Sequence, residues 1–296
     1  MAVEFALGAA LSYGVADFAG GLATRARPAA RVAALAETVG LIPLLPVALL
    51  VGTEFSGRAM LLGAAGGACA AVGLVLYFRA LAVGPMGVVA PAASVVGAAV
   101  PVAIGLVTGT ALGPVAIVGI VVAALAVVLT APPATDRDDA GPAPDSGSAT
   151  SPGPDERAAP RWRTARGPLY GLVSGIGFGL FFVFLHAAPA GSGVWPLVGA
   201  RCGSLLLLGP ALFVRRGEHR PGGWWLIVVS GLLDMAANLL FLLAVRGSDL
   251  ATSSVLVSLY PIVVVLLAQS LLAERLDARQ RTGVAAALTA AVLLAL

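Results

Sequence analysis

Charged residues are scarce in this chain, and one kind is missing altogether. Of the 296 residues, 11% are charged and 59% are hydrophobic, and all 18 basic residues are Arg because the sequence contains no Lys. A soluble domain carries about 25% charged residues, so this composition excludes an ordinary soluble fold and indicates a membrane protein. The arginines lie between apolar blocks and form no basic face, so no nucleic-acid partner is expected.

The residues that carry most enzyme and metal chemistry are equally rare. The two cysteines, Cys69 and Cys202, each lie inside an apolar block without metal-ligand spacing, and we interpret them as small packing residues. The two histidines are His186, near the end of an apolar block, and His219, in a polar loop. No His-Glu metal motif or phosphate-loop motif is present. We therefore predict no cofactor, no metal and no enzyme activity, with a membrane-embedded enzyme acting on lipid or peptide as the less favoured alternative.

Long apolar blocks fill most of the chain. A helix needs about 20 residues to cross a hydrocarbon core, and helices are expected because lipid offers the backbone no other hydrogen-bonding partner. We predict an all-α integral membrane protein with ten transmembrane helices. The predicted spans are 4–23, 32–51, 59–79, 86–107, 112–131, 168–188, 194–214, 223–245, 250–272 and 281–296.

One long polar segment divides the chain. Residues 132–167 are dense in Pro, Gly, Ser and Asp, and cannot bury enough apolar surface to fold alone. We interpret this segment as a disordered linker between a five-helix unit at 1–131 and a second five-helix unit at 168–296. Its composition leaves open whether the linker binds a partner or merely spans the gap.

The arginines predict the orientation of the spans. Those in the loops after spans 1, 3, 5, 7 and 9 fall on one side of the membrane, and among the loop arginines only Arg58 and Arg246 fall on the other. Cytoplasmic loops carry an excess of Arg and Lys. We therefore expect a multi-pass protein of the inner or plasma membrane, with the linker in the cytoplasm and both termini outside. The arginines on the predicted cytoplasmic side are Arg25, Arg27, Arg31, Arg79, Arg137, Arg157, Arg161, Arg163, Arg166, Arg215, Arg216, Arg220, Arg275, Arg279 and Arg281.

The two halves resemble each other at an offset of 164 or 165 residues. Small residues spaced by four, which allow another helix to approach closely, recur in the first span of each half: Ala6, Ala10 and Gly14 match Gly171, Gly175 and Gly179. Because each half has an odd number of predicted spans, the second half enters the membrane inverted, and the arginine-bearing loops change places accordingly. Inverted repeats are typical of secondary transporters, whose site lies near the midplane where the halves meet.

Short motifs near the ends of the spans carry a family resemblance. They are Leu11-Ser12-Tyr13-Gly14, Tyr77-Phe78-Arg79-Ala80-Leu81-Ala82-Val83-Gly84-Pro85, and Tyr260-Pro261 followed by Leu271-Leu272-Ala273-Glu274-Arg275-Leu276. On these residues the chain resembles the EamA-type members of the drug/metabolite transporter superfamily. The resemblance implies ten spans in two five-span units and the export of a small organic solute. The chain departs from the family pattern at Gly109-Thr110, where the family usually has Gly-Glu, and in its long linker.

Four ionisable side chains fall inside predicted spans, where a charge costs a few kcal/mol or more: Asp17, Glu37, Arg201 and Asp234. Asp234 is central in its span, with Asn238 one turn on along the same face. It is a candidate proton carrier, or a polar residue that joins helices. Glu37 and Arg201 occupy equivalent positions of the two halves, which suggests a salt bridge with a structural role or a role in gating or carboxylate binding. Their heights on opposite sides of the midplane mean that this pairing needs long side chains or tilted helices.

Aromatic residues near these charges are further candidates for the pathway. Tyr13 lies one turn before Asp17, which could face the pathway or extend toward the interface. Tyr77 and Tyr260 could line a cavity, with packing or interface anchoring as the alternative. Glu274, at the end of the ninth span, is interpreted as a loop charge and not as a site residue.

Together these features predict a secondary transporter that moves a small organic solute, such as a metabolite or drug, outwards by alternating access. Proton exchange through Asp234, Glu37 or Asp17 is the expected coupling. An uncoupled facilitator or an uptake permease is the alternative. The expected partners are the solute, protons and the lipid bilayer, with the chain acting as a monomer or homodimer.

Overall fold

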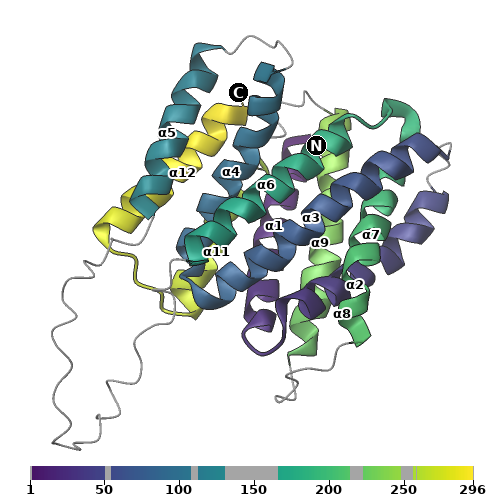
Figure 1. Ribbon diagram of the computed structural model, residues 1–296, viewed down its shortest axis with the longest axis horizontal. Helices are drawn as coiled ribbons and strands as arrows, with labels where there is room; N and C mark the ends of the chain where they lie inside the picture. Colours follow the sequence, from purple (N-terminus) through teal and green to yellow (C-terminus); the bar gives the residue numbers. More distant parts are fainter. Residues whose placement is uncertain are drawn as a thin grey trace, which may run out of the picture.

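The computed structural model describes residues 2–50, 55–107, 113–130, 166–213, 223–247, 256–257 and 259–295. All regular secondary structure in these residues is helical (Figure 1), which confirms the all-α prediction. The helices are α1 (Ala2–Thr24), α2 (Ala29–Leu50), α3 (Gly57–Val83), α4 (Met86–Val107), α5 (Pro114–Thr130), α6 (Arg166–His186), the short 3-10 helix η4 (Ala190–Ser192), α7 (Trp195–Leu208), α8 (Pro210–Phe213), α9 (Trp224–Gly247), α11 (Tyr260–Leu271) and α12 (Ala278–Ala295).

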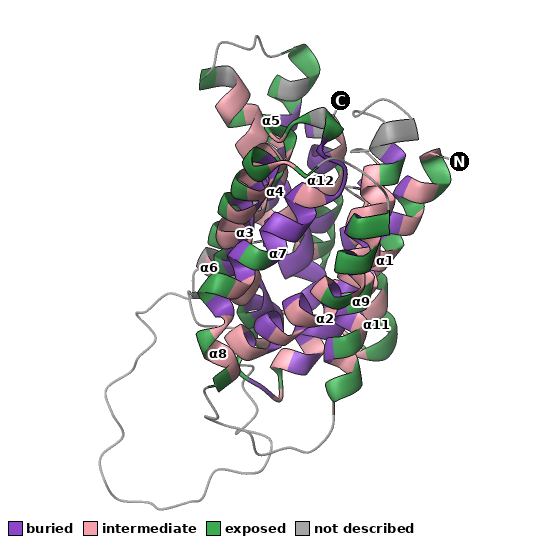
Figure 2. Cartoon of the chain, turned by 90° about the vertical axis from the view of Figure 1, so that its right-hand side faces the viewer, coloured by how far each residue is buried: buried purple, intermediate pink, exposed green. Residues whose placement is uncertain are grey.

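Length and composition identify the chain as a multi-pass membrane protein. Among the described residues, 5 helices are long and apolar enough to cross a membrane: α1, α2, α3, most of α4 and most of α9. Shorter apolar stretches lie in α5, α6, α7 and α11. Large apolar side chains such as Leu49, Leu61 and Leu206 are exposed on the outside of the bundle. Figure 2 shows buried residues on the inner faces of the helices and exposed residues on the outer faces, the arrangement expected of a bundle surrounded by lipid.

The described helices fall on the predicted apolar blocks, with one clear difference. The span predicted at 194–214 is not a single helix, because α7 ends at Leu208 and α8 begins at Pro210. Proline has no N–H to continue the helix, and its ring disturbs the preceding turn. The backbone closes the end of α7 instead with a 2.6 Å hydrogen bond from Gly209 N to Leu205 O.

Two other predictions lie partly or wholly outside the described residues. The linker at 132–167 is described only from Arg166, where α6 begins. In the span predicted at 250–272, the described helix α11 runs from Tyr260 to Leu271, with Pro261 in its first turn, a position where the missing N–H costs nothing.

Most close contacts join a helix from residues 2–130 to a helix from residues 166–295. Helix α1 packs against α9 and α11, and α3 packs against α6 and α7. Helix α2 packs against α7 and α9, α4 packs against α6, α11 and α12, and α5 packs against α12. The two parts of the chain are therefore interleaved along the whole bundle and do not form two separate lobes (Figure 1).

Glycines bring these helices into backbone contact. A Cβ atom added at Gly67 of α3 would lie 2.6 Å from Ala200 Cα on α7, and one added at Gly203 of α7 would lie 2.6 Å from Ala64 Cα on α3. Ser204 completes the contact, because its Oγ donates a 2.8 Å hydrogen bond to the carbonyl oxygen of Gly67. Small residues allow this approach in lipid, where helix association depends on close van der Waals contact and interhelical hydrogen bonds.

The repeated small residues predicted to receive a neighbouring helix do so at three of their positions. An added Cβ at Gly14 would lie 2.8 Å from the carbonyl oxygen of Tyr260 on α11, and one at Gly175 would lie 2.6 Å from that of Ala93 on α4. Gly179 meets α4 in the same way. The interpretation is wrong for Gly171, where an added Cβ would meet nothing within 4 Å.

Replacing Gly175 by Ala is expected to lower the thermal unfolding midpoint of the detergent-solubilised protein. The new Cβ would lie 2.6 Å from both Ala93 O and Val96 Cβ, and such overpacking costs about 1–3 kcal/mol. Gly171→Ala is the matched control, because it makes the same change one turn earlier on α6 in open space. Equal midpoints for the two variants would contradict a tight contact between α6 and α4.

Candidate functional site

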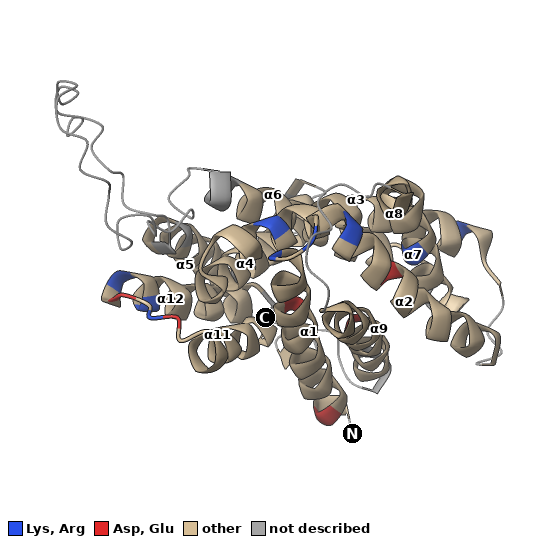
Figure 3. Cartoon of the chain, turned by 90° about the horizontal axis from the view of Figure 1, so that it is seen from below, with Lys and Arg blue, Asp and Glu red and all other residues tan. Residues whose placement is uncertain are grey.

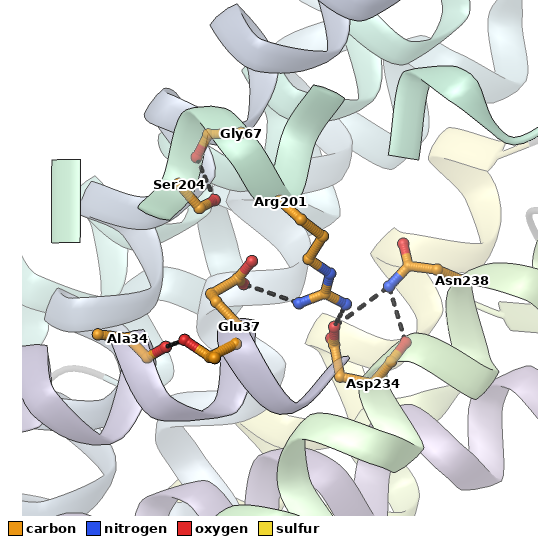
Figure 4. Close-up of polar contacts among 8 residues, drawn as sticks. Ala34, Glu37, Gly67, Arg201, Ser204, Asp234 and Asn238 are labelled. Carbon is orange, nitrogen blue, oxygen red and sulfur yellow. Dashed lines mark hydrogen bonds and ion pairs between the residues drawn. The ribbon is translucent and has the colours of Figure 1, made fainter. Parts of the chain in front are cut away.

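A buried arginine joins three helices near the middle of the bundle (Figure 4). Arg201 extends from α7, and its Nη1 lies 3.0 Å from Oε1 of Glu37 on α2. Its Nη2 donates a hydrogen bond to Oδ2 of Asp234 on α9. The salt bridge expected between Glu37 and Arg201 is therefore present, and the guanidinium is shared with a second carboxylate that the sequence did not pair with it.

The three charged groups differ in their exposure. The side chains of Arg201 and Glu37 are only 8% and 11% exposed, whereas that of Asp234 is 34% exposed. Two carboxylates share one guanidinium, so the group carries one negative charge in excess when every member is ionised. In a low-dielectric interior such an excess is expensive. A proton or a cationic group could neutralise this charge, and Asp234 has the most exposed side chain of the three.

Polar and small residues around the arginine help to fix its position. Asn238 lies one turn along α9 and donates a 2.7 Å hydrogen bond to the backbone oxygen of Asp234, with a 3.3 Å contact to its Oδ2. A Cβ added at Gly40 of α2 would lie 3.3 Å from Arg201 Cζ and 2.9 Å from the carbonyl oxygen of Gly231 on α9. Glycine at position 40 therefore leaves room for the guanidinium between α2 and α9.

A second carboxylate contact lies between α1 and α3. The hydroxyl of Tyr77 donates a 2.9 Å hydrogen bond to Oδ2 of Asp17. Tyr77 is fully buried, and its ring meets that of Phe178 edge-on at a centroid distance of 5.5 Å. The predicted alternative in which Asp17 extends toward the interface does not fit this contact, because the carboxylate faces a buried tyrosine of another helix.

Tyr13 packs beside the start of α11, where its ring lies 6.0 Å from that of Tyr260. The eight residues predicted for the pathway therefore fall into three contact groups, which we together call the central cluster. Its members are Tyr13, Asp17, Glu37, Tyr77, Arg201, Asp234, Asn238 and Tyr260.

Glu274 lies in the connection between α11 and α12, as expected of a loop charge, and it has a contact that the sequence did not predict. Its two carboxylate oxygens each accept a 3.1 Å hydrogen bond, from Met86 N and from Gly87 N. These are the first two backbone amides of α4, and amides at the start of a helix have no hydrogen-bonding partner within that helix. The sequence did contain a signal for this contact. Gly84 and Pro85 precede α4, and neither has a side chain that could cap the helix, so a cap from another part of the chain was to be expected.

The described residues contain no group of three or more His, Cys, Asp and Glu side chains placed to hold a metal ion. The central cluster is instead a set of hydrogen-bonded and charged groups that can bind a polar solute or move a proton.

Comparisons with known proteins agree with a membrane transporter. The sequence model of the EamA-like transporter family matches residues 165–296. Over the second half of the chain, the match supports the resemblance to EamA-type transporters of the drug/metabolite transporter superfamily that the motifs carry.

The other two comparisons bear on the fold. In the solved structures, 7 chains match, and one of them, described only as the crystal structure of a protein, superposes with a TM-score of 0.61 over 99% of this chain and 95% of its own length. At 16% sequence identity this similarity shows a shared fold and carries no information on substrate. The search of curated proteins gave no match.

Arg201→Gln is expected to destabilise the protein by about 3–5 kcal/mol, because it leaves the buried carboxylate of Glu37 and the half-buried carboxylate of Asp234 without their partner. The matched control is Arg79→Gln, which removes an arginine from an exposed position on α3. Thermal unfolding in detergent measures both. Adding Glu37→Gln and Asp234→Asn to Arg201→Gln should restore part of the loss, since no charge then remains unpaired. An Arg201→Gln variant as stable as Arg79→Gln would contradict the shared ion pair.

Proposed function

We propose that the protein is a secondary transporter that moves a small organic solute across the membrane by alternating access around the central cluster. The observation that carries the proposal is the buried Glu37–Arg201–Asp234 group, in which one side chain from residues 2–130 meets two from residues 166–295. Ionisable residues inside membrane helices are expensive and generally mark substrate or proton pathways. A site shared between the two parts of a transporter is where their relative movement can alter access.

The proposed architecture has ten spans in two inverted units, in which α1 to α5 correspond to α6, α7, α9, α11 and α12. The helix contacts support this correspondence. Helix α1 packs on α9 as α6 packs on α3, and α2 packs on α9 as α7 packs on α3. Helix α1 packs on α11 as α6 packs on α4, while α2, α4 and α5 each contact their own counterparts. A pseudo-two-fold axis through the centre of the bundle would produce this pattern.

In the proposed mechanism, Asp234 is the group that changes its partner, by taking up a proton or by giving up Arg201 to the solute. Its side chain is more open than those of Glu37 and Arg201, and its partner Arg201 also binds a carboxylate of the other unit. Protonation of Asp234, or binding of a polar solute group to Arg201, would change how Arg201 is shared between Asp234 of its own unit and Glu37 of the other unit, and would favour a different arrangement of the units. Export is proposed as the direction because the family resemblance implies it.

In the proposed orientation, one end of the bundle carries Arg25, Arg27, Arg79 and Arg275 and is called the arginine-rich end. This end faces the cytoplasm of an inner- or plasma-membrane protein. Figure 1 supports one part of this arrangement, since both ends of the chain lie together at the opposite end of the bundle. Figure 3 views the arginine-rich end, where basic residues are spread over several helices and charges of both signs lie at the connection between α11 and α12. An excess of basic residues is characteristic of cytoplasmic loops.

The first test compares solutes inside and outside cells that express the wild type or Asp234→Asn. A solute depleted inside and enriched outside only with the wild type would identify substrate and direction together and support the role of Asp234. Asp277→Asn is the matched control, because the Asp277 carboxylate accepts a 2.7 Å hydrogen bond from Gln280 N at the start of α12, away from the central cluster.

The same solute, reconstituted with purified protein in liposomes, separates the alternatives. A proton-coupled transporter should accumulate it against a gradient when a pH difference is imposed, and Asp234→Asn should abolish accumulation while leaving downhill exchange. An uncoupled facilitator would equilibrate the solute in both forms without accumulation. Equal accumulation by the wild type and Asp234→Asn would remove Asp234 from the mechanism.

A further inference from the structure

The first amides of α4 are bound by a carboxylate from a distant part of the chain. Glu274 follows the end of α11, and its Oε1 and Oε2 each accept a 3.1 Å hydrogen bond, from Met86 N and Gly87 N respectively. A carboxylate at a helix N-terminus satisfies unpaired N–H groups and interacts favourably with the helix dipole. The Glu274 side chain is 15% exposed, so these hydrogen bonds are largely shielded from water.

The backbone before Glu274 is held in an unusual conformation. Ala273 has a φ of 52° and is the one non-glycine residue with positive φ among the described residues. Two hydrogen bonds to the carbonyl oxygen of Ala268 fix this turn, a 3.1 Å bond from Leu272 N and a 3.2 Å bond from Glu274 N. A strained residue persists where its surroundings determine the conformation, and here the result is that the Glu274 carboxylate faces α4.

Two arginines of the turn between α1 and α2 make further contacts across the same end of the bundle. Nη2 of Arg25 lies 3.9 Å from Oε1 of Glu274. Cζ of Arg27 lies 4.4 Å from the centre of the Trp224 ring at the start of α9, within the range of a cation–π interaction. All of these contacts join residues 2–130 to residues 166–295 at the arginine-rich end.

The counterpart of Glu274 at the repeat offset is Thr110, because 274 and 110 differ by the 164 residues that relate Glu37 to Arg201. A threonine side chain has one neutral hydroxyl and cannot offer two charged acceptor oxygens to a helix N-terminus. The sequence therefore provides this carboxylate in the second half of the chain and not at the equivalent position of the first half.

We propose that the contact of Glu274 with Met86, Gly87 and Arg25, hereafter the Glu274 contact, is a gate that holds the arginine-rich end of the transport pathway closed. The inference rests on the proposed alternating-access function. Opening that end requires α4 and the end of α11 to separate, which breaks two charge-assisted hydrogen bonds at once. Because the sequence has Thr110 and no glutamate at the equivalent position of the repeat, the empty protein favours the state closed at the arginine-rich end.

Pulsed electron–electron resonance in lipid nanodiscs tests the gate without any substrate. One spin-label pair, at Pro28→Cys and Ala278→Cys, reports on the arginine-rich end at two exposed positions. A second pair, at Gly57→Cys and Gly191→Cys, reports on the opposite end, where an added Cβ at either position meets nothing within 4 Å. Both pairs are introduced after replacing Cys69 and Cys202 by Ala.

The wild type should give one narrow distance distribution for the first pair. Glu274→Ala should add a longer distance and raise the ratio of open to closed molecules about tenfold or more, since hydrogen bonds to a charged group are lost. Glu274→Gln keeps the size of the side chain and one acceptor, so it should show a smaller shift in the same direction and covers the case in which Glu274→Ala does not fold. Asp277→Asn changes a nearby acidic residue that precedes α12 and accepts a hydrogen bond from its first turn, and it should match the wild type.

The second label pair separates failure of the gate from failure of the transport proposal. Unchanged distances at the arginine-rich end in both Glu274 variants would overturn the gate, whatever the transport assays show. Opening of that end together with shortening of the Gly57–Gly191 distance supports the gate and alternating access. Opening of that end with no change at the other supports the Glu274 contact as a closure and contradicts alternating access.

Discussion

Backbone contact between helices from the two parts of the chain is the constraint on which the rest of this structure depends. Lipid provides no hydrophobic driving force between apolar helices, so association relies on close approach and on polar contacts. Gly67 and Gly203 bring α3 and α7 together, and Gly40 and Gly231 do the same for α2 and α9. Only with α7 held in this position can Arg201 reach carboxylates on both α2 and α9. The same contacts that form the fold therefore assemble the site.

The shared guanidinium also explains how such a site can be both stable and responsive. A single buried ion pair would be neutral and closed to exchange, whereas two carboxylates on one arginine leave an excess negative charge. In the proposed mechanism, that excess makes the arrangement sensitive to a proton or a solute at Asp234, the more exposed carboxylate. The Asp17–Tyr77 hydrogen bond and the Tyr13–Tyr260 ring contact extend the polar region through α1, α3 and α11. Movement of any of these helices would change the environment of the charged groups.

Much of this arrangement could be predicted from the sequence, because the relevant signals are local. Apolar length located the helices, and the cost of charge in lipid selected Glu37, Arg201 and Asp234, which the structure brings into contact. The contact partners of these side chains were harder to predict, because they depend on how each helix is tilted and rotated. Apolar residues face both lipid and neighbouring helices, so their pattern in the sequence does not indicate this orientation. The estimate that Glu37 and Arg201 lie at different heights assumed upright helices, and their 3.0 Å contact shows that tilt and side-chain length overcome the difference. The contact of Glu274 with α4 was missed because it joins a loop to the first residue of a helix 188 positions earlier in the chain.

The central claim, that helices of the two units hold each other and the site together, is tested most directly by separating the units. Residues 1–131 and 168–296 would be co-expressed as two polypeptides, with an affinity tag on the first, and the membranes solubilised in mild detergent. The account predicts that the tagged unit recovers the other in equal amount, as one monodisperse species, and that the second unit carrying Arg201→Gln is recovered in smaller amount. Two units that each purify alone as folded, monodisperse proteins would contradict it, because their contacts would then not be what holds the fold or the central cluster in place.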